Sequence, residues 1–248
     1  MTQLLVILYG PSGSGKTSMI DYAIKKYNIE NPIKILIDSI IMNNENYKKA
    51  TTEIIDDYDK SKLNYNSANL EILDKQLEQS LYNIYDTYRK SKNGDLLSDS
   101  LLKRSLEKKR NIIYEGTGKN TSIEWLIYVS KLANEQNYKI VVLFPFVTIN
   151  RLTERVKFRF GKLPEKEPRI INKDELNIMY GESINNFNKL INCSYINEIT
   201  IVDNNYSTIE YEILFSVDES IITCSNKLFE YLNATTNLYI FLSSLYFI

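Results

Sequence analysis

The sequence predicts an α/β fold of three layers, in which helices cover both faces of a parallel sheet. Short runs rich in Ile and Val recur along the chain, and such runs are typical of strands buried on both faces. The stretches between them keep helical spacing, and strands that alternate with helices form parallel sheets. A glycine-rich turn joins the first run to the first helical stretch. With 248 residues, the chain can bury a substantial core.

The expected elements follow one another in a regular order. A strand over residues 4–9 ends at Gly10, and a helix over residues 16–27 follows the glycine-rich turn. About seventy residues with helical spacing separate the second strand from the third, so we expect a helical insertion there. The strands are predicted at residues 4–9, 33–38, 111–115, 139–146 and 198–202.

An apolar stripe within the insertion indicates core packing, because its members recur every three or four residues. The stripe consists of Leu70, Leu73, Leu77, Leu81, Ile84 and Tyr88. Residues 91–94 are expected to break the helix.

The C-terminal part of the chain is expected to be helical over residues 206–233. The apolar tail 238–248 that follows is too short to span a bilayer. We expect a docked terminal helix or strand there, with a membrane or partner contact as the alternative.

Composition excludes several kinds of chemistry. The chain has no histidine, which removes histidine-dependent triads, histidine zinc sites and imidazole bases. The 30 basic and 31 acidic residues leave a net charge of −1, so no overall field favours a nucleic acid. Cys193 and Cys224 form no C-x-x-C pattern, and no signal peptide precedes the first strand. We expect a reduced, cytoplasmic protein without a membrane span.

Residues 10–17 fit the phosphate-loop pattern G-x-x-x-x-G-K-[ST] at every required position. They lie between an expected strand and an expected helix, where backbone N–H groups can surround a phosphate. We expect Lys16 to contact the β- and γ-phosphates of ATP and the Thr17 hydroxyl to ligate Mg²⁺. A turn that binds nothing is the alternative. The predicted nucleotide-binding residues are Gly10, Pro11, Ser12, Gly13, Ser14, Gly15, Lys16, Thr17 and Ser18.

Other classes of phosphate-loop protein fit the rest of the chain less well. A GTPase should carry N-K-x-D, and residues 172–175, Asn-Lys-Asp-Glu, miss this motif by the position of the acid. Motor ATPases usually have an apolar strand that ends in Asp or Asp-Glu, whereas the third strand here ends in Glu115. The sequence therefore favours a phosphoryl-transfer enzyme.

A second motif lies at residues 114–121, Tyr-Glu-Gly-Thr-Gly-Lys-Asn-Thr, and together with the phosphate loop it resembles the zeta toxin family. Members of that family are P-loop kinases that phosphorylate a hydroxyl of UDP-N-acetylglucosamine, and chloramphenicol phosphotransferases are their relatives. The resemblance runs from about residue 3 to residue 205. It implies a kinase domain at residues 1–205 and an extension at residues 206–248 that packs on the same domain.

The resemblance implies that four residues hold the acceptor. Glu115 and Thr117 match the E-G-T segment that lines the family's sugar-nucleotide pocket. Lys119 stands where an arginine is usual, and lysine keeps the charge but lacks the planar fork. Asp99 falls at the position of a substrate-binding glutamate and has a shorter reach.

Residues 150–169 resemble the family's arginine-bearing lid, with Arg155 and Arg169 as the best matches. Arginines on a closing lid stabilise the charge of a phosphoryl group in transfer. Since Arg151, Arg155 and Arg159 also form an i, i+4 row, a solvated helix face is the alternative.

The general base departs from the family pattern. The family has D-x-D after the second strand, whereas Ile40 occupies the second acidic position here. Asp38 is therefore the candidate base, and a capping role for its carboxylate is the alternative.

The leading prediction is an ATP- and Mg²⁺-dependent kinase for which Lys16, Asp38, Arg155 and Arg169 carry catalysis. The resemblance implies a UDP-N-acetylglucosamine-like sugar nucleotide as the acceptor. The alternatives are a nucleoside, nucleotide or polynucleotide kinase, and a catalytically degenerate ATP-binding protein that acts through an inhibitory or target protein partner. A nucleic acid is disfavoured, because basic and aromatic residues do not interleave in the insertion.

Overall fold

The computed structural model describes most of the chain. The described residues are 2–56, 65–66, 71–72, 75–91, 94–160, 171, 173–206, 211–218 and 221–233.

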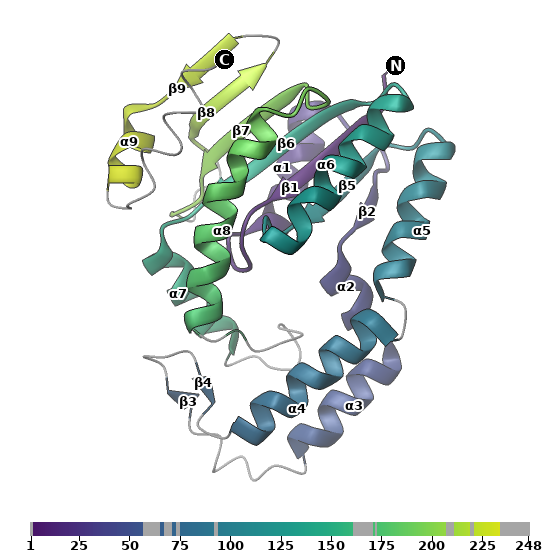
Figure 1. Cartoon of the computed structure of the whole chain (residues 1–248), viewed down its shortest axis with the longest axis vertical. Helices are drawn as coiled ribbons and strands as arrows, with labels where there is room; N and C mark the ends of the chain where they lie inside the picture. The colour runs from purple at the N-terminus through teal and green to yellow at the C-terminus, as the bar shows by residue number, and fades with distance from the viewer. Residues whose placement is uncertain are drawn as a thin grey trace.

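A seven-stranded sheet forms the centre of the fold, in the order β2-β5-β1-β6-β7-β8-β9 (Figure 1). The first five strands in this order are parallel, and β8 and β9 add to the edge in antiparallel pairing. The predicted α/β fold with a parallel sheet is thus confirmed. The strands are β1 (Leu4–Tyr9), β2 (Ile33–Ile35), β5 (Ile112–Gly116), β6 (Lys139–Phe146), β7 (Glu198–Asp203), β8 (Ile213–Asp218) and β9 (Ile221–Cys224).

Side chains of β1 alternate between two separate cores. Ile7 and Tyr9 point to the face covered by α6 and α8, whereas Val6 and Leu8 point to the face covered by α1. Because both faces of the strand are covered, its apolar run is uninterrupted. The covering helices are α1 (Met19–Tyr27), α6 (Asn120–Glu135) and α8 (Lys173–Ile191), and α7 (Ile149–Phe160) follows β6.

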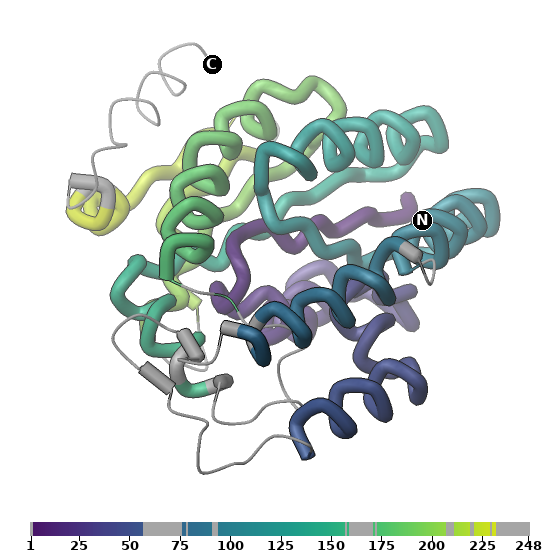
Figure 2. The backbone as a smooth tube through the Cα atoms, turned by 60° about the horizontal axis from the view of Figure 1, so that its bottom comes forward, coloured from purple at the N-terminus to yellow at the C-terminus, as the bar shows by residue number. Residues whose placement is uncertain are grey.

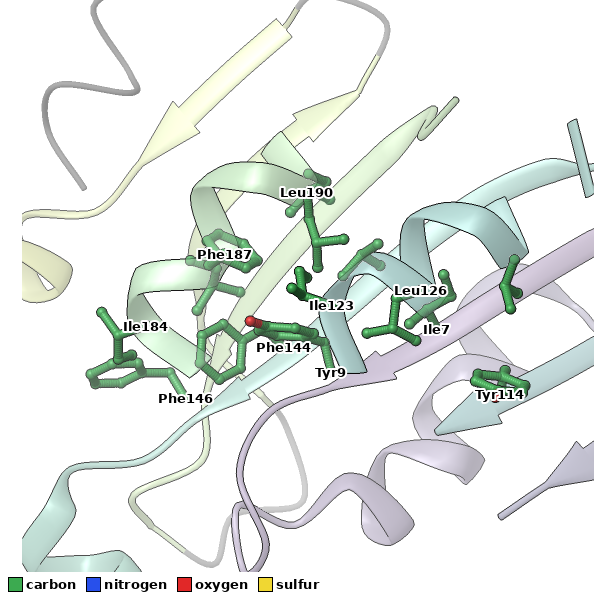
Figure 3. Close-up of a cluster of buried hydrophobic side chains, with 14 of the residues drawn as sticks. Ile7, Tyr9, Tyr114, Ile123, Leu126, Phe144, Phe146, Ile184, Phe187 and Leu190 are labelled. Atoms are coloured by element: carbon green, nitrogen blue, oxygen red, sulfur yellow. The ribbon is translucent and has the colours of Figure 1, made fainter. Parts of the chain in front are cut away.

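An aromatic cluster attaches α8 to the carboxyl end of the sheet (Figure 3). The ring of Phe144 on β6 lies 5.3 Å from the rings of both Tyr9 and Phe187, measured between centroids. The Tyr9 hydroxyl donates a hydrogen bond of 2.6 Å to the carbonyl oxygen of Ser183 on α8. Burial raises the pKa of Tyr9 far above its ordinary value, so this hydroxyl stays protonated. The cluster fixes α8 beside the turn that follows β1.

The structure confirms most strand predictions and shortens one. β1 and β6 have the predicted bounds, β5 is shifted by one residue toward the C-terminus, and β7 extends one residue beyond its predicted end. The second strand, predicted over residues 33–38, ends at Ile35, and helix α2 (Ile37–Met42) begins two residues later. β2 is an edge strand that pairs with β5 over three residues, so few ladder hydrogen bonds favour its continuation. The predicted helix over residues 16–27 begins as a 3-10 turn, η1 (Lys16–Ser18), and continues as α1.

The predicted helical insertion lies between β2 and β5, and Figures 1 and 2 show α3 and α4 side by side in it. Its elements have a small core of their own, made by Ile41, Tyr47 and Tyr85. A short antiparallel pair, β3 (Tyr65–Asn66) with β4 (Glu71–Ile72), was not predicted. The helical elements are α2, α3 (Glu45–Asp56), α4 (Lys75–Asp86), the π-helical turn η3 (Thr87–Ser91) and α5 (Gly94–Glu107).

The apolar stripe of the insertion packs as expected where it is described. Leu77 and Leu81 are buried, and Ile84 and Tyr88 pack against the small core. The break was predicted at residues 91–94; η3 ends at Ser91 and α5 begins at Gly94, and the two residues between them lie outside the described residues. The other two members, Leu70 and Leu73, lie outside the described residues.

The prediction of helix over residues 206–233 is wrong for its middle part. β8 and β9 form a hairpin that extends the sheet beyond β7, and of the residues described in this range only those of α9 (Asn226–Asn233) are helical. β8 buries Leu214 and Phe215, whereas all of β9 is exposed at the sheet edge. The tail 238–248 lies outside the described residues. Within the part of the chain that is described, no helix has the length and apolar character that crossing a membrane requires.

Candidate active site

The phosphate loop connects the carboxyl end of β1 to the helical turn η1. Gly13 and Gly15 adopt φ angles of 85° and 94°, in the left-handed region that glycine tolerates best. A Cβ at Gly15 would also collide with the side-chain amide of Asn204. The sequence requires glycine at position 15 for both reasons.

The side chain of Lys16 folds back onto the phosphate loop. Its Nζ donates hydrogen bonds of 3.0 Å to the carbonyl oxygens of Gly10 and Pro11, and it lies 3.3 Å from Oε1 of Glu115. Both side chains are largely buried, so the pair is shielded from solvent. Lys16 of the phosphate loop and Glu115 of the second motif therefore meet in one site.

The loop has the properties of an anion cradle. Ser14 is fully buried, and its Oγ has no hydrogen-bond partner among the described residues. Thr17 is exposed at the start of the helix, where its hydroxyl is accessible. Mg²⁺ usually takes one or two protein oxygen ligands together with phosphate oxygens and water, so this donor set fits a Mg-nucleotide. No group of three or more acidic or cysteine side chains that could hold a metal occurs among the described residues.

Two helices and the end of β7 brace the loop from outside. Asn204 Nδ2 donates a hydrogen bond of 2.6 Å to the carbonyl oxygen of Ser14. Arg155 of α7 donates to the same oxygen at 3.2 Å and to the carbonyl oxygen of Asn204 at 2.6 Å. The backbone N–H of Ser12 points at the sulfur of Met179 on α8, at 3.2 Å. These contacts determine the loop's position relative to the sheet.

A cavity of about 240 Å³ opens beside Lys16. It collects residues from β2, α2, the insertion, the end of β5 and the start of α6. Besides Lys16, four of the residues predicted for catalysis or acceptor binding line it, namely Asp38, Asp99, Glu115 and Thr117. The remaining lining residues are Ser12, Ile35, Ile37, Tyr85, Arg89, Asp95, Ser98, Tyr114, Thr121, Ser122, Trp125 and Leu126.

Asp38 lies in the first turn of α2 and faces this cavity. The hydroxyl of Tyr85 on α4 donates a hydrogen bond of 2.7 Å to its Oδ1. Ile40, two residues later on the same helix, does not line the cavity. Residues two apart on a helix point in nearly opposite directions, so an acidic side chain at position 40 would not share the cavity with Asp38.

Asp99 faces the cavity from α5. Burial raises the pKa of Asp99, the charge of Lys103 opposes this effect, and the nearby Asp95 carboxylate adds to it. The Asp99 carboxyl group therefore binds a proton more readily than an exposed aspartate.

The residues after β5 divide between the cavity and its surroundings. The Thr117 hydroxyl lines the cavity and lies 3.2 Å from Oγ of Ser122. Lys119 does not line it and instead pairs with Glu175 of α8 at 3.1 Å. The structure thus places Thr117 with Asp99 and Glu115, the other residues predicted to hold the acceptor, and Lys119 apart from them.

Arg155, the predicted lid arginine that the structure describes, does not line the cavity. Arg155 contacts the outer side of the phosphate loop, as described above, and Arg151 donates to the carbonyl oxygen of Asn205 at 3.1 Å. Arg169 and the side chain of Arg159 lie outside the described residues.

Sequence reasoning missed the aromatic and basic residues that the insertion and α6 supply. Trp125 Nε1 donates a hydrogen bond of 2.8 Å to the hydroxyl of Tyr114. The rings of Trp125, Tyr114 and Tyr85 form an aromatic wall of the cavity. Arg89 stands four residues after Tyr85 and also lines the cavity. Helical spacing could have placed Tyr85 and Arg89 on one face, but nothing in the sequence shows that this face meets the phosphate loop.

Comparison with protein-family models and with curated proteins finds no match for this sequence. Among solved structures, a chain of the PezAT chromosomal toxin–antitoxin system of Streptococcus pneumoniae is similar in fold, with a TM-score of 0.59 and 17% identity. The match covers 85% of this chain and 72% of that chain. A proposed kinase from Chloroflexus aurantiacus matches with a TM-score of 0.35 and 13% identity over 73% of this chain and 79% of that chain, which is too distant to carry an argument. The first of these similarities confirms, at the level of the fold, the resemblance to zeta toxin-like P-loop kinases that the two sequence motifs indicate.

Proposed function

We propose that this protein is an ATP- and Mg²⁺-dependent kinase that transfers the γ-phosphate to a hydroxyl of an acceptor bound in the cavity. The carrying observation is that the phosphate-loop lysine, Lys16, and the carboxylates of Asp38, Asp99 and Glu115 meet at one cavity. Phosphoryl transfer needs a positioned phosphate, a positioned hydroxyl and electrostatic compensation, and these residue types can supply all three.

On the nucleotide side, the loop amides and Lys16 would hold the β- and γ-phosphates, and Thr17 would ligate Mg²⁺. Binding requires Lys16 to exchange its loop carbonyls and Glu115 for phosphate oxygens. Magnesium supplies charge neutralisation between the transferred group and the leaving oxygen when it is bound. Arg155 and Arg169 remain the proposed lid arginines, and Arg155 additionally braces the loop.

On the acceptor side, Asp38 would accept the hydroxyl proton as that oxygen attacks the γ-phosphorus. The new P–O bond forms as the bond to the β-phosphate oxygen breaks, and ADP leaves. Tyr85 holds one Asp38 oxygen, so the other is available to the acceptor. Asp99, Glu115 and Thr117 offer polar groups for further hydroxyls, and the resemblance points to a UDP-N-acetylhexosamine as the acceptor.

The test is transfer of labelled γ-phosphate from ATP with Mg²⁺ to UDP-N-acetylglucosamine, other UDP-sugars, nucleosides and a 5′-hydroxyl oligonucleotide. We expect label in the UDP-sugar, with at least a 100-fold loss for Lys16→Ala and for Asp38→Asn. Label in nucleosides or the oligonucleotide alone would replace the proposed acceptor class. An unchanged transfer rate in Lys16→Ala would refute the kinase assignment.

A second candidate is an ATP-binding protein that acts through a protein partner without turnover. The structurally similar chain belongs to a toxin–antitoxin system, and this observation favours the second candidate. Nucleotide binding by the intact protein without label in any acceptor would support this candidate over the kinase.

A further inference from the structure

We propose that Arg89 binds an anionic group of the acceptor, a phosphate or diphosphate, at the insertion side of the cavity. This inference rests on the proposed function, because it concerns the acceptor of that same site. It assigns a role to a residue outside both sequence motifs, toward the diphosphate that the proposed UDP-sugar acceptor carries.

Two cations line the cavity among the described residues, Lys16 and Arg89. Lys16 is engaged with the loop carbonyls and Glu115, and a bound nucleotide would engage it further. Lys119 is paired with Glu175 outside the cavity. Arg89 is therefore the cation best placed to meet an acceptor.

The contacts of Arg89 leave much of its guanidinium group available. Its Nε donates to both carboxylate oxygens of Asp95, at 3.1 and 3.4 Å, while no described residue accepts a hydrogen bond from its two terminal nitrogens. The planar fork of a guanidinium binds phosphate oxygens in a bidentate manner. A lysine at this place could not do the same.

The pair with Asp95 leaves the guanidinium group of Arg89 accessible. The side chains of Arg89 and Asp95 are 40% and 49% exposed, and such exposed pairs exchange readily with other partners. Arg89 lies within the π-helical turn η3, directly after α4, and it follows Tyr85 by four residues. The same helical segment thus carries both Tyr85, which contacts Asp38, and the guanidinium group of Arg89. An acceptor could therefore place its hydroxyl at Asp38 and its phosphate at Arg89.

The charge of the cavity makes this role necessary for a phosphorylated acceptor. Asp38, Asp95, Asp99 and Glu115 all line it, and a bound nucleotide that takes Lys16 would leave Glu115 unpaired. An acceptor that carries a phosphate would be repelled unless a cation faces that phosphate. Arg89 provides this compensation.

The experiment measures binding of three probes by titration calorimetry without nucleotide: UDP-N-acetylglucosamine, N-acetylglucosamine 1-phosphate and N-acetylglucosamine. For Arg89→Gln we expect on the order of a 10-fold or larger rise in Kd for the two phosphate-bearing probes and no change for the uncharged sugar. Arg89→Lys should recover only part of the affinity, because it restores the charge but not the fork. Arg104→Gln, an exposed arginine on α5 outside the cavity lining, is the matched control and should change nothing.

Asp95→Asn separates a binding role from a structural one. It removes the partner of Arg89 and should leave the affinity for the phosphate-bearing probes unchanged or higher. The inference is overturned if Asp95→Asn weakens binding as much as Arg89→Gln does, if Arg89→Gln weakens all three probes equally, or if the wild-type protein binds neither phosphate-bearing probe. Since no phosphate transfer is measured, the result is independent of whether the bound acceptor is turned over.

Discussion

Lys16 and Glu115 form a buried ion pair in the structure, with Nζ 3.3 Å from Oε1. The lysine that is proposed to contact the γ-phosphate is thus held by a residue proposed to contact the acceptor. A nucleotide must compete with Glu115 for Lys16, and its binding then frees the carboxylate for the acceptor. The pair would favour binding of the nucleotide before the acceptor.

Glu115→Gln tests this competition. The variant should unfold at a lower temperature than the wild type without ligand, because a buried cation loses its charged partner. It should gain more thermal stability from ATP and Mg²⁺, because Lys16 no longer leaves an ion pair to bind phosphate. Thermal unfolding with and without nucleotide measures both effects. Glu107→Gln, an exposed position on α5, is the control, and an equal gain in Glu115→Gln and wild type would show that the pair does not compete with nucleotide.

Tyr85→Phe tests the proposed orientation of the base. Loss of the 2.7 Å hydrogen bond to Asp38 should lower kcat by about 10-fold, a typical effect of one hydrogen bond to a charged group, while KM for ATP stays unchanged. In an Asp38→Asn background the same change should have little further effect, since the two residues act as one unit. Additive losses in the double variant would mean that Tyr85 acts independently of Asp38.

Asn204→Ala should weaken nucleotide binding without changing the acceptor side. The variant loses the 2.6 Å hydrogen bond to the Ser14 carbonyl oxygen but keeps the backbone carbonyl oxygen of residue 204 that accepts from Arg155. We expect KM for ATP to rise about 10-fold, and steady-state kinetics measures it. Asn185→Ala, at an exposed position on α8, should match the wild type. A fall in kcat with unchanged KM for ATP would instead place Asn204 in the transfer step.

Asp203 should make the stability of the fold depend on pH. Burial acts to raise its pKa, but hydrogen bonds from Lys227, Asn205 and Tyr231 outweigh burial and hold the pKa of Asp203 below its ordinary value. A carboxyl group with a lowered pKa stabilises the fold above its unfolded-state pKa of about 3.9, and this contribution is lost as the pH falls through the folded-state value.

At pH 7, Asp203→Asn should therefore lower the free energy of unfolding by about 1–3 kcal/mol. On acidification, the variant should lose less stability than the wild type. Denaturant unfolding between pH 7 and pH 2 checks this expectation. Asp218→Asn, whose carboxylate is half exposed, is the control. Parallel acid profiles for Asp203→Asn and wild type would contradict the assignment.

The sequence alone was sufficient to predict the parts that depend on local pattern. Buried parallel strands have uninterrupted apolar runs, so β1 and β6 were located to the residue. The hairpin β8–β9 was missed because β9 is exposed along its whole length and carries no core pattern. The range predicted for β2 was longer than the observed strand, because an apolar run does not indicate where an edge strand stops pairing with its neighbour.

The candidate site could be predicted only for residues inside recognisable motifs. Lys16, Glu115 and Thr117 belong to two motifs at the ends of neighbouring parallel strands, and the structure brings them to one cavity. Tyr85 and Arg89 lie in the insertion, and their contribution depends on how that insertion folds back over the sheet edge. Such a tertiary relationship leaves no trace in local spacing.

The small core of the insertion has a consequence for how the protein recognises its acceptor. Ile41, Tyr47 and Tyr85 form a cluster separate from the two cores that flank β1, so the helices around it should open as a unit of lower stability than the sheet. Amide hydrogens of α3 and α4 should then exchange faster than those of β1 and β6, and a bound acceptor should slow them selectively. Exchange at equal rates in both regions would refute a separate unit.

If the insertion is a separate unit, the affinity for the acceptor would then include the free energy of ordering the insertion. Substitutions in the core of the insertion would change acceptor selectivity and leave nucleotide affinity unaltered.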